Sequence, residues 1–322
     1  MFKLKKKILA LATVLVVGAF GLVGCSNDKN ETTKDEPTKI VLVLDKGGVQ
    51  DESFNQSAWT GAIKAKEELG VEVKYLESVT DTDYAQNIET AIDMGSDLII
   101  GIGFNLSQAI EEAAISYPEQ QFAIIDGSFE KIPDNVTSIL FNEKEAGYLA
   151  GIVAAATDKN SNKFGFVGGF EVPAVVNYKE GFEQGIKEVN PNAELYTQYA
   201  NSFTDASKGR VIAQQMVSQG VEKIMTAGGG VNAGVYEVCS EKGKHAIAVD
   251  MAQSNISPET ILTSAIKKVD VGIYETIKSY IGGNLKGGIS HMHDISNNGV
   301  GYEDTKLLTD EVRQLVNEKI SK

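Results

Sequence analysis

Short apolar runs alternate with amphipathic segments from Lys39 onward, and this alternation constrains the fold more than any other feature of the chain. Short apolar runs suit buried strands, and segments with apolar residues three and four positions apart suit the helices that cover them. Strand–helix alternation with right-handed crossovers produces parallel sheets covered on both faces. The first series predicts strands at 40–44, 71–76, 98–101, 122–125 and 137–141, with helices at 55–69, 84–94 and 106–116.

A second series of the same kind follows, with expected strands at 164–167, 194–199, 223–225 and 246–249 and helices at 144–157, 175–189, 204–219 and 231–242. After Asp250 the order changes to a strand at 261–266, a helix at 269–282 and a closing helix at 304–320. Two similar series with such a tail predict an α/β protein of two doubly wound lobes. We expect an N-terminal lobe of 39–141 plus 251–283 and a C-terminal lobe of 142–250 plus 284–322, with hinges near 141–142, 250–251 and 282–284.

The first 24 residues are typical of an export signal, because four lysines precede the apolar run 8–23. That run is shorter than the roughly 20 residues of a membrane-spanning helix, which is the alternative interpretation. Leu22-Val23-Gly24-Cys25 resembles a lipobox, which implies that Cys25 is lipidated and becomes the mature N-terminus. Residues 25–38 are polar and predict a flexible tether. We therefore expect a protein lipid-anchored to the extracytoplasmic face of the cell membrane.

The charge argues against a nucleic-acid-binding protein, and the cysteine content argues against a fold stabilised by disulfides. The formal net charge of −14 becomes about −18 once the four lysines of the signal are removed, so nucleic acid would be repelled. With Cys25 lipidated, only Cys239 remains, and no intramolecular disulfide can form. Cys239 lies in a helical pattern and is expected to be a small buried apolar residue.

Polar or glycine-rich groups follow several of the expected strands. Asp45, Asp126 and Asp250 each come directly after a strand, and glycine-rich segments follow others. Glycine at such a place can simply form a turn, and an acid can cap a helix. Because the carboxyl ends of parallel strands meet at one edge of a sheet, three aspartates at these ends together indicate a shared ligand cleft.

The segment 45–61 reads D-x-G-G-x-x-D-x-S-F-N-Q-S-A-W-x-G. It resembles the first motif of the basic membrane protein family of bacterial lipoproteins, which are substrate-binding proteins of nucleoside ABC transporters. The resemblance implies a type I periplasmic-binding-protein fold with a multi-crossover hinge. It also implies a purine nucleoside as ligand and an ABC transporter permease and ATPase as partners, with no catalysis and no cofactor.

The resemblance also implies a set of ligand-binding residues, and the chemistry of a nucleoside suits them. A purine offers two flat faces for aromatic stacking and N–H groups for an acceptor such as Asp126. Asp250 could accept from ribose hydroxyls, and Lys267 could donate to them. The expected positions are Asp45, Phe54 and Asn55 in the first motif, Asp126 in A-I-I-D-G, Phe203 in N-S-F-T-D, Gly229 in A-G-G-G, Asp250 in A-V-D and Lys267 in T-S-A-I-K-K-V-D.

Two alternatives remain open. A nucleoside-cleaving enzyme would need metal-holding acids or a positioned general acid and base. His291-Met292-His293-Asp294 has no evident third ligand nearby, so we expect no metal site, and no G-x-S-x-G, Walker A or G-x-G-x-x-G motif is present. The same lobes could instead bind a sugar or a small signalling molecule. The mature chain has only Arg210 and Arg313, both in expected helices, which favours a neutral ligand.

Overall fold

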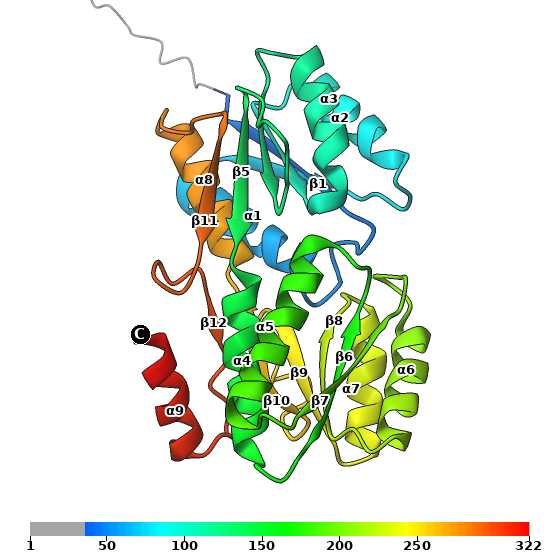
Figure 1. Ribbon diagram of the computed structural model, residues 1–322. Coiled ribbons are helices and arrows are strands. Elements are labelled where there is room, and N and C mark those ends of the chain that lie inside the picture. The colour runs from blue at the N-terminus through cyan, green and yellow to red at the C-terminus, as the bar shows by residue number, and fades with distance from the viewer. Residues whose placement is uncertain (1–35, 322) are drawn as a thin grey trace, which may run out of the picture. The chain divides into compact units, whose positions relative to one another are not determined.

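The framework of this computed structural model, which describes residues 36–321, is a pair of six-stranded sheets (Figure 1). The expected signal at 1–24, the lipidation at Cys25 and nearly all of the tether at 25–38 lie outside the described residues. Residues 37–321 belong to one compact unit.

The first sheet has the strand order β11-β5-β4-β3-β1-β2, and all of its neighbouring strands are parallel. Successive strand residues point to opposite faces: Leu42 packs in a cluster with Ala58 and Ala62 of one helix, whereas Val43 packs with Tyr84 and Ile88 of another. The strands are β1 (Lys39–Leu44), β2 (Glu72–Leu76), β3 (Leu98–Ile102), β4 (Gln121–Ile125), β5 (Val136–Phe141) and β11 (Ile289–His293). The helices are α1 (Phe54–Leu69), α2 (Asp83–Asp93), α3 (Ser107–Ser116) and α8 (Val269–Ile281), with the short 3-10 helix η1 (Phe104–Leu106).

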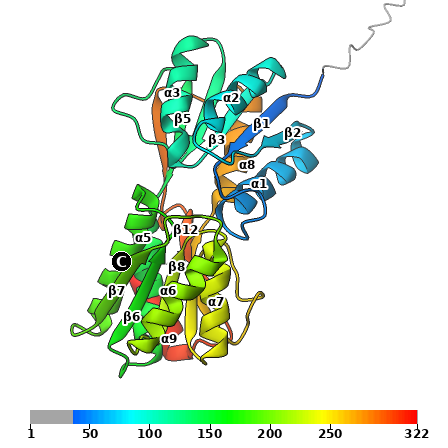
Figure 2. The same cartoon turned by 90° about the vertical axis from the view of Figure 1, so that its right-hand side faces the viewer.

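The second sheet repeats this order as β12-β10-β9-β8-β6-β7, with β12 antiparallel to β10 at its edge. Figure 2 shows α6 and α7 beside β8 in this half, and α1 and α8 together in the other. The strands are β6 (Lys163–Gly168), β7 (Glu194–Tyr199), β8 (Lys223–Ala227), β9 (His245–Asp250), β10 (Ile261–Lys267) and β12 (Val300–Tyr302). The helices are α4 (Glu143–Thr157), α5 (Pro173–Val189), α6 (Ala206–Ser218), α7 (Val231–Glu241) and α9 (Asp310–Ile320).

These two sheets confirm the predicted α/β fold of two doubly wound lobes. Ten expected strands and nine expected helices are present within a few residues of their predicted bounds, except that the closing helix begins at Asp310 and not at 304. The short strands β11 and β12 were not predicted as separate elements. The chain passes between the sheets three times, after β5, after β10 and after β11, as a multi-crossover hinge requires.

The predicted assignment of the tail to the two lobes was wrong in two places. Strand β10, expected in the N-terminal lobe, pairs with β9 of the second sheet. Strand β11, expected in the C-terminal lobe, pairs with β5 of the first sheet from Ile289↔Thr137 to His293↔Phe141. The second and third crossovers therefore lie near 268 and between 293 and 300, not at 250–251 and 282–284. Apolar periodicity identifies a strand, but the choice of neighbour depends on contacts distant in sequence.

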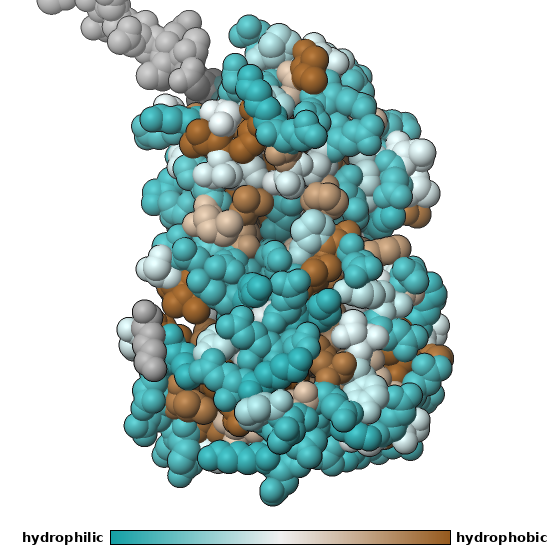
Figure 3. Space-filling model, viewed as in Figure 1, coloured by the Kyte–Doolittle hydropathy of each residue, from teal (hydrophilic) through white to brown (hydrophobic). Residues whose placement is uncertain are grey.

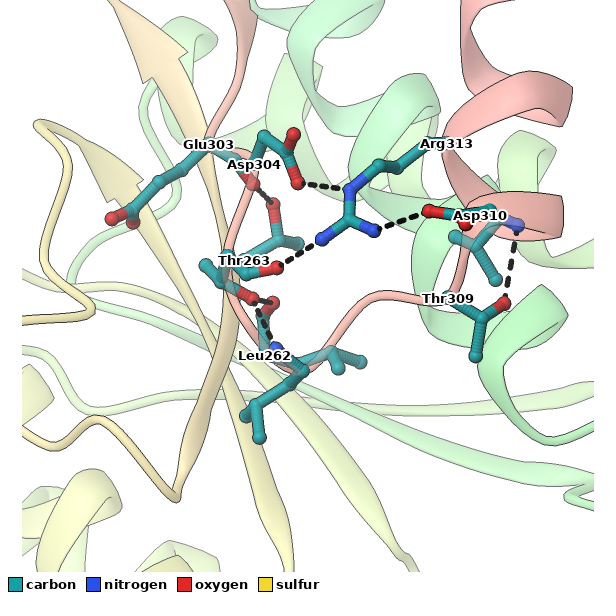
Figure 4. Close-up of polar contacts among 10 residues, drawn as sticks. Leu262, Thr263, Glu303, Asp304, Thr309, Asp310 and Arg313 are labelled. Atoms are coloured by element: carbon teal, nitrogen blue, oxygen red, sulfur yellow. Dashed lines mark hydrogen bonds and ion pairs between the residues drawn. The ribbon is translucent and has the colours of Figure 1, made fainter.

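The closing helix α9 is fixed to the second half by Arg313 (Figure 4). Its guanidinium donates to Asp304 Oδ1 at 2.7 Å, to Asp310 Oδ1 at 2.9 Å and to the Thr305 carbonyl at 3.0 Å. Arg210 is similarly engaged, by Glu237 and Glu241. Both arginines therefore serve ion pairs on helices.

The face shown in Figure 3 is largely hydrophilic, with apolar residues in small separate patches. Isolated apolar side chains of this kind are normal on a protein surface. None of the helices within residues 36–321 combines the length and the apolar character needed to cross a membrane.

Candidate functional site

The carboxyl ends of strands from both sheets surround one cavity with about 630 Å³ of empty space, including its open mouth. All eight predicted site residues line the cavity: Asp45, Phe54, Asn55, Asp126, Phe203, Gly229, Asp250 and Lys267. The parallel strands bring them together because equivalent strand ends meet at one edge of each sheet.

The segment between β1 and α1 is folded around two aspartates. Asp51 accepts hydrogen bonds from the backbone N–H groups of Ser53, Asn55 and Gln56, and thereby caps the start of α1. The Asn55 amide donates to Asp45 Oδ1 at 2.8 Å and to Asp51 at 3.1 Å. Asp51 thus holds the segment in shape, and Asn55 fixes the Asp45 carboxylate at the cavity wall.

Lys267 is the centre of a buried ion network that joins the two halves. It lies at the end of β10 in the second sheet and is 1% exposed. Its ammonium donates to Asp126 Oδ2, beyond β4 of the first sheet, at 2.5 Å, and to Glu143 Oε1 of α4 at 2.8 Å. Glu143 also accepts from the Asn177 amide at 3.1 Å. One cation therefore serves two carboxylates from different parts of the fold.

Asp250 makes a second connection between the halves. Its Oδ2 accepts a short hydrogen bond from the Ser53 hydroxyl, which precedes α1, and its Oδ1 accepts from the Tyr178 hydroxyl of α5 at 3.1 Å. Asp250 and Asp126 have φ values of 67° and 59°, in the left-handed region. Non-glycine residues in this region are uncommon and cluster at functional sites. Asp250 is the last residue of β9 and Asp126 directly follows β4, and these two strands occupy equivalent places in the two sheets.

Aromatic rings enter the cavity from both halves. Phe54 begins α1, and Phe203 lies between β7 and α6. The Lys267 ammonium lies 5.0 Å from the centroid of the Phe54 ring. Gly169 makes room for Phe203, because a Cβ at this glycine would come within 2.3 Å of the ring. An aromatic clamp with one ring from each half is therefore sterically possible here.

Burial and the crowding of acids dominate the electrostatics of the cavity. Desolvation raises the pKa of Asp45 to about 6, although its hydrogen bond from Asn55 acts in the opposite direction. Desolvation likewise raises the pKa of Asp126 to about 7. The Lys267 ammonium acts against this rise, whereas the negative charges of Glu143 and Asp250 add to it. Burial opposes the charge of Lys267, but the surrounding carboxylates hold its pKa above the usual value. Lys267 therefore stays protonated, while the carboxylates of Asp45 and Asp126 take up a proton at higher pH than an ordinary aspartate does.

Two buried acceptor atoms in the cavity lining have no hydrogen-bond partner, Asn55 Oδ1 and Asp126 Oδ1. A buried acceptor without a partner costs about 1–3 kcal/mol. Both atoms therefore favour a ligand that brings N–H or O–H donors into the cavity.

Ser53, Glu143 and Tyr178 contact the predicted site residues and were not themselves predicted. Ser53 lies within the 45–61 motif and could have been found there. Glu143 directly follows the crossover at 141–142, where a charged residue at a helix start resembles an ordinary cap. Tyr178 gave no signal, because a tyrosine in an amphipathic helix is indistinguishable from core packing. Phe104 and Asn105, from a segment noted for its glycines, also line the cavity.

Within residues 36–321, no three His, Cys, Asp or Glu side chains converge in a way that could hold a metal ion. His291 and His293 lie on the edge strand β11, away from the cavity lining, and His293 stacks on Phe141 at 4.9 Å between ring centroids. Neither Arg210 nor Arg313 lines the cavity. Among the described residues of its lining, Lys267 carries the positive charge.

Known proteins resemble this chain over nearly its whole length. The family model for PnrA-like substrate-binding proteins of ABC transporters matches residues 38–322. A CD4+ T-cell-stimulating antigen of Listeria innocua is 36% identical over 94% of this chain and 91% of that protein. The ABC transporter nucleoside-binding protein BmpA of Lactococcus lactis is 33% identical over 92% of this chain and 91% of its own length.

A solved structure agrees with these sequence relatives. The ABC transporter solute-binding protein from Aeropyrum pernix K1 superimposes with a TM-score of 0.83 and 28% sequence identity. The match covers 88% of this chain and 90% of that one, so it includes both sheets.

Proposed function

The chain belongs to the Bmp family of PnrA-like substrate-binding proteins of ABC transporters, and we propose that it captures purine nucleosides in the cavity between its two sheets. The observation that carries this proposal is the combination of unpaired buried acceptors, Asn55 Oδ1 and Asp126 Oδ1, with aromatic rings from both halves. A nucleoside matches both features, because its base offers flat faces and N–H donors. The Lactococcus lactis relative, named as a nucleoside-binding protein, supports the same class of ligand.

The charges of the cavity favour a neutral ligand over a nucleotide. Asp45, Asp51, Asp126 and Asp250 line it together with Lys267, which already serves two carboxylates. A phosphate would meet this excess of negative charge without an arginine to bind it. Guanosine, inosine and adenosine carry no such charge, and each supplies donors for the unpaired acceptors.

The proposed mechanism is hinge closure about the three connections between the sheets. A ligand that contacts strand ends of both sheets stabilises the closed form by its differential contacts. The closed protein would then deliver the nucleoside to the permease of an ABC transporter, with its ATPase as the energy source. The lipobox at Cys25 supports a position at the extracytoplasmic face of the membrane.

Asp250 is proposed to meet the ribose hydroxyls, with Lys267 as a donor nearby. In the structure the two Asp250 oxygens accept from Ser53 and Tyr178, so the carboxylate is held rigidly and each oxygen has one further lone pair to offer. Gly229 contributes close backbone approach, since its φ of 57° and the nearby Phe203 carbonyl leave little room for a Cβ.

The test is the thermal midpoint of the full chain in detergent against guanosine, inosine, adenosine, cytidine, free bases, ribose and GMP. A ligand at about 100 times its Kd adds about 2.7 kcal/mol, which raises the midpoint by several degrees. Stabilisation by purine nucleosides, with no response to ribose or GMP, is the expected result. A response to sugars alone would instead identify a sugar receptor, and release of free base during incubation would identify a nucleoside-cleaving enzyme.

A further inference from the structure

A second hollow adjoins the ligand cavity and shares Asn105 and Val172 with it. Its lining includes Lys46, which follows Asp45, and Phe170, which follows β6 of the other sheet. This hollow therefore lies at a junction of the two halves, directly beside the proposed nucleoside site.

Lys46 connects the two halves across this hollow. Its ammonium forms an ion pair with Asp81 of the first half at 2.8 Å. The same ammonium lies 5.2 Å from the centroid of the Phe170 ring of the second half. Lys46 thus makes one contact within its own half and one across to the other.

The contact continues to the ligand cavity through Phe170. The Phe170 ring packs edge-on against Phe203, with 5.1 Å between the centroids and 65° between the planes. Phe203 lines the cavity, whereas Lys46, Asp81 and Phe170 do not. A change at Lys46 can therefore reach the cavity wall through two successive ring contacts without any contact to a ligand.

We propose that Lys46 and Phe170 form a latch, in the hollow beside the ligand cavity, that sets how long a bound nucleoside stays. The inference rests on the proposed nucleoside function and adds two residues outside the cavity to it. A ligand leaves only when the halves separate, and separation breaks the Lys46–Phe170 contact. Association begins from separated halves, in which the contact is not yet made. The latch therefore acts on the dissociation rate and leaves the association rate unchanged.

The expected size follows from the nature of the contact. Cation–π pairs at partly exposed sites contribute about 0.5–1 kcal/mol, which corresponds to a change of about two- to fivefold in the dissociation rate. Asp81 is largely exposed, so its ion pair orients Lys46 and contributes little by itself.

The experiment is stopped-flow measurement of guanosine and inosine binding to the full chain, with Lys46→Met, Phe170→Leu and the double variant. Methionine keeps an unbranched apolar stem of similar length and removes the ammonium. Lys46→Met is expected to raise the dissociation rate about two- to fivefold with an unchanged association rate. In the Phe170→Leu background the same substitution is expected to have no effect, because the partner ring is already gone.

Lys64→Met is the matched control. The Lys64 ammonium lies 4.7 Å from the Tyr274 ring, a contact of the same kind between α1 and α8 within the first half. Its loss is expected to leave both rates unchanged, since the contact does not cross between the halves.

The outcomes separate the two proposals. If the wild-type protein binds nucleosides and Lys46→Met dissociates at the wild-type rate, the latch is overturned and the nucleoside function stands. If Lys46→Met has the same effect with and without the Phe170 ring, the effect comes from the charge alone and the latch is again overturned. Failure of the wild-type protein to bind any nucleoside would overturn the proposed function, and the latch with it.

Discussion

Lys267 Nζ donates to Asp126 Oδ2 at 2.5 Å and thereby connects the end of β10 in the second sheet with the end of β4 in the first. The same two side chains line the ligand cavity. Residues that would hold a ligand therefore also hold the halves together. Under the proposed hinge closure, this arrangement would couple occupancy of the cavity to the relative position of the halves.

Lys267→Met is expected to destabilise the protein by about 3–5 kcal/mol, because it leaves the buried Asp126 and Glu143 carboxylates without their cation. Urea unfolding of the full chain measures the change. The triple variant Lys267→Met/Asp126→Asn/Glu143→Gln removes the unpaired charges as well and is expected to recover most of the loss. A Lys267→Met protein as stable as the wild type would show that the network contributes nothing to the fold.

Nucleoside affinity is expected to rise with pH between about 6 and 8. The pKa of Asp126 is raised to about 7, chiefly by burial, and only the ionised carboxylate offers Oδ1 as a strong acceptor. Below that pKa each pH unit is expected to weaken binding by up to about tenfold. Asp126→Asn is expected to bind more weakly at pH 8 and to show a flat profile above about pH 7, where Asp45, with its pKa of about 6, is largely ionised. Calorimetric titrations across this range decide the matter, and identical profiles for the two proteins would contradict the assignment.

Asp45→Asn is expected to stabilise the unliganded protein at neutral pH. The folded-state pKa of Asp45 is about 6 against an ordinary value of 3.8, so the folded protein binds this proton more tightly than the unfolded chain does. Ionisation therefore lowers the stability progressively from about pH 4 to pH 6, by about 3 kcal/mol in total. Thermal midpoints should show Asp45→Asn above the wild type at pH 7.5 and equal to it near pH 4. An advantage that is the same at both pH values would indicate a cause other than ionisation.

Phe54→Leu is expected to lower the affinity for purine nucleosides about two- to tenfold. This change corresponds to the loss of an aromatic stacking contact, which contributes about 0.5–1.5 kcal/mol. Free ribose, which has no base, should be unaffected. Phe129→Leu is a suitable control, because Phe129 packs against the core of the first half and does not line the cavity. Equal losses for nucleoside and ribose in a direct binding assay would exclude a stacking role for Phe54.

Asp250→Asn is expected to reduce nucleoside affinity strongly while leaving the fold intact. Asparagine tolerates the φ of 67° at this position, so the backbone is not disturbed. It keeps one oxygen for Ser53 or Tyr178, but it cannot serve both of these hydroxyls and a ligand as an acceptor. Calorimetry measures the affinity and circular dichroism checks the fold. Unchanged affinity would remove Asp250 from the binding site.

The secondary-structure elements and the residues that line the cavity could be predicted from the amino-acid sequence. Alternation of apolar runs with amphipathic segments has a period that depends only on the local chain, so strands such as Glu194–Tyr199 could be predicted with their bounds. Aspartates placed after strands could be predicted to meet, because the geometry of parallel sheets brings strand ends to one edge. Asp45, Asp126 and Asp250 accordingly line one cavity.

The division of the C-terminal tail between the two sheets, and the hydrogen-bond partners of the site residues, depend on long-range packing that could not be predicted from the sequence. The strands β10 and β11 follow each other along the chain, yet they join opposite sheets. Strand β10 pairs with the neighbouring β9 of the second sheet, as in Ile266↔Asp250, whereas β11 pairs with the distant β5 of the first sheet, as in Ile289↔Thr137. Lys267 could be predicted to donate, but its partners Asp126 and Glu143 are separated from it by 141 and 124 residues. Contacts between residues so far apart in the chain produce no periodic pattern in the sequence. They form only when the two sheets pack around a common cavity.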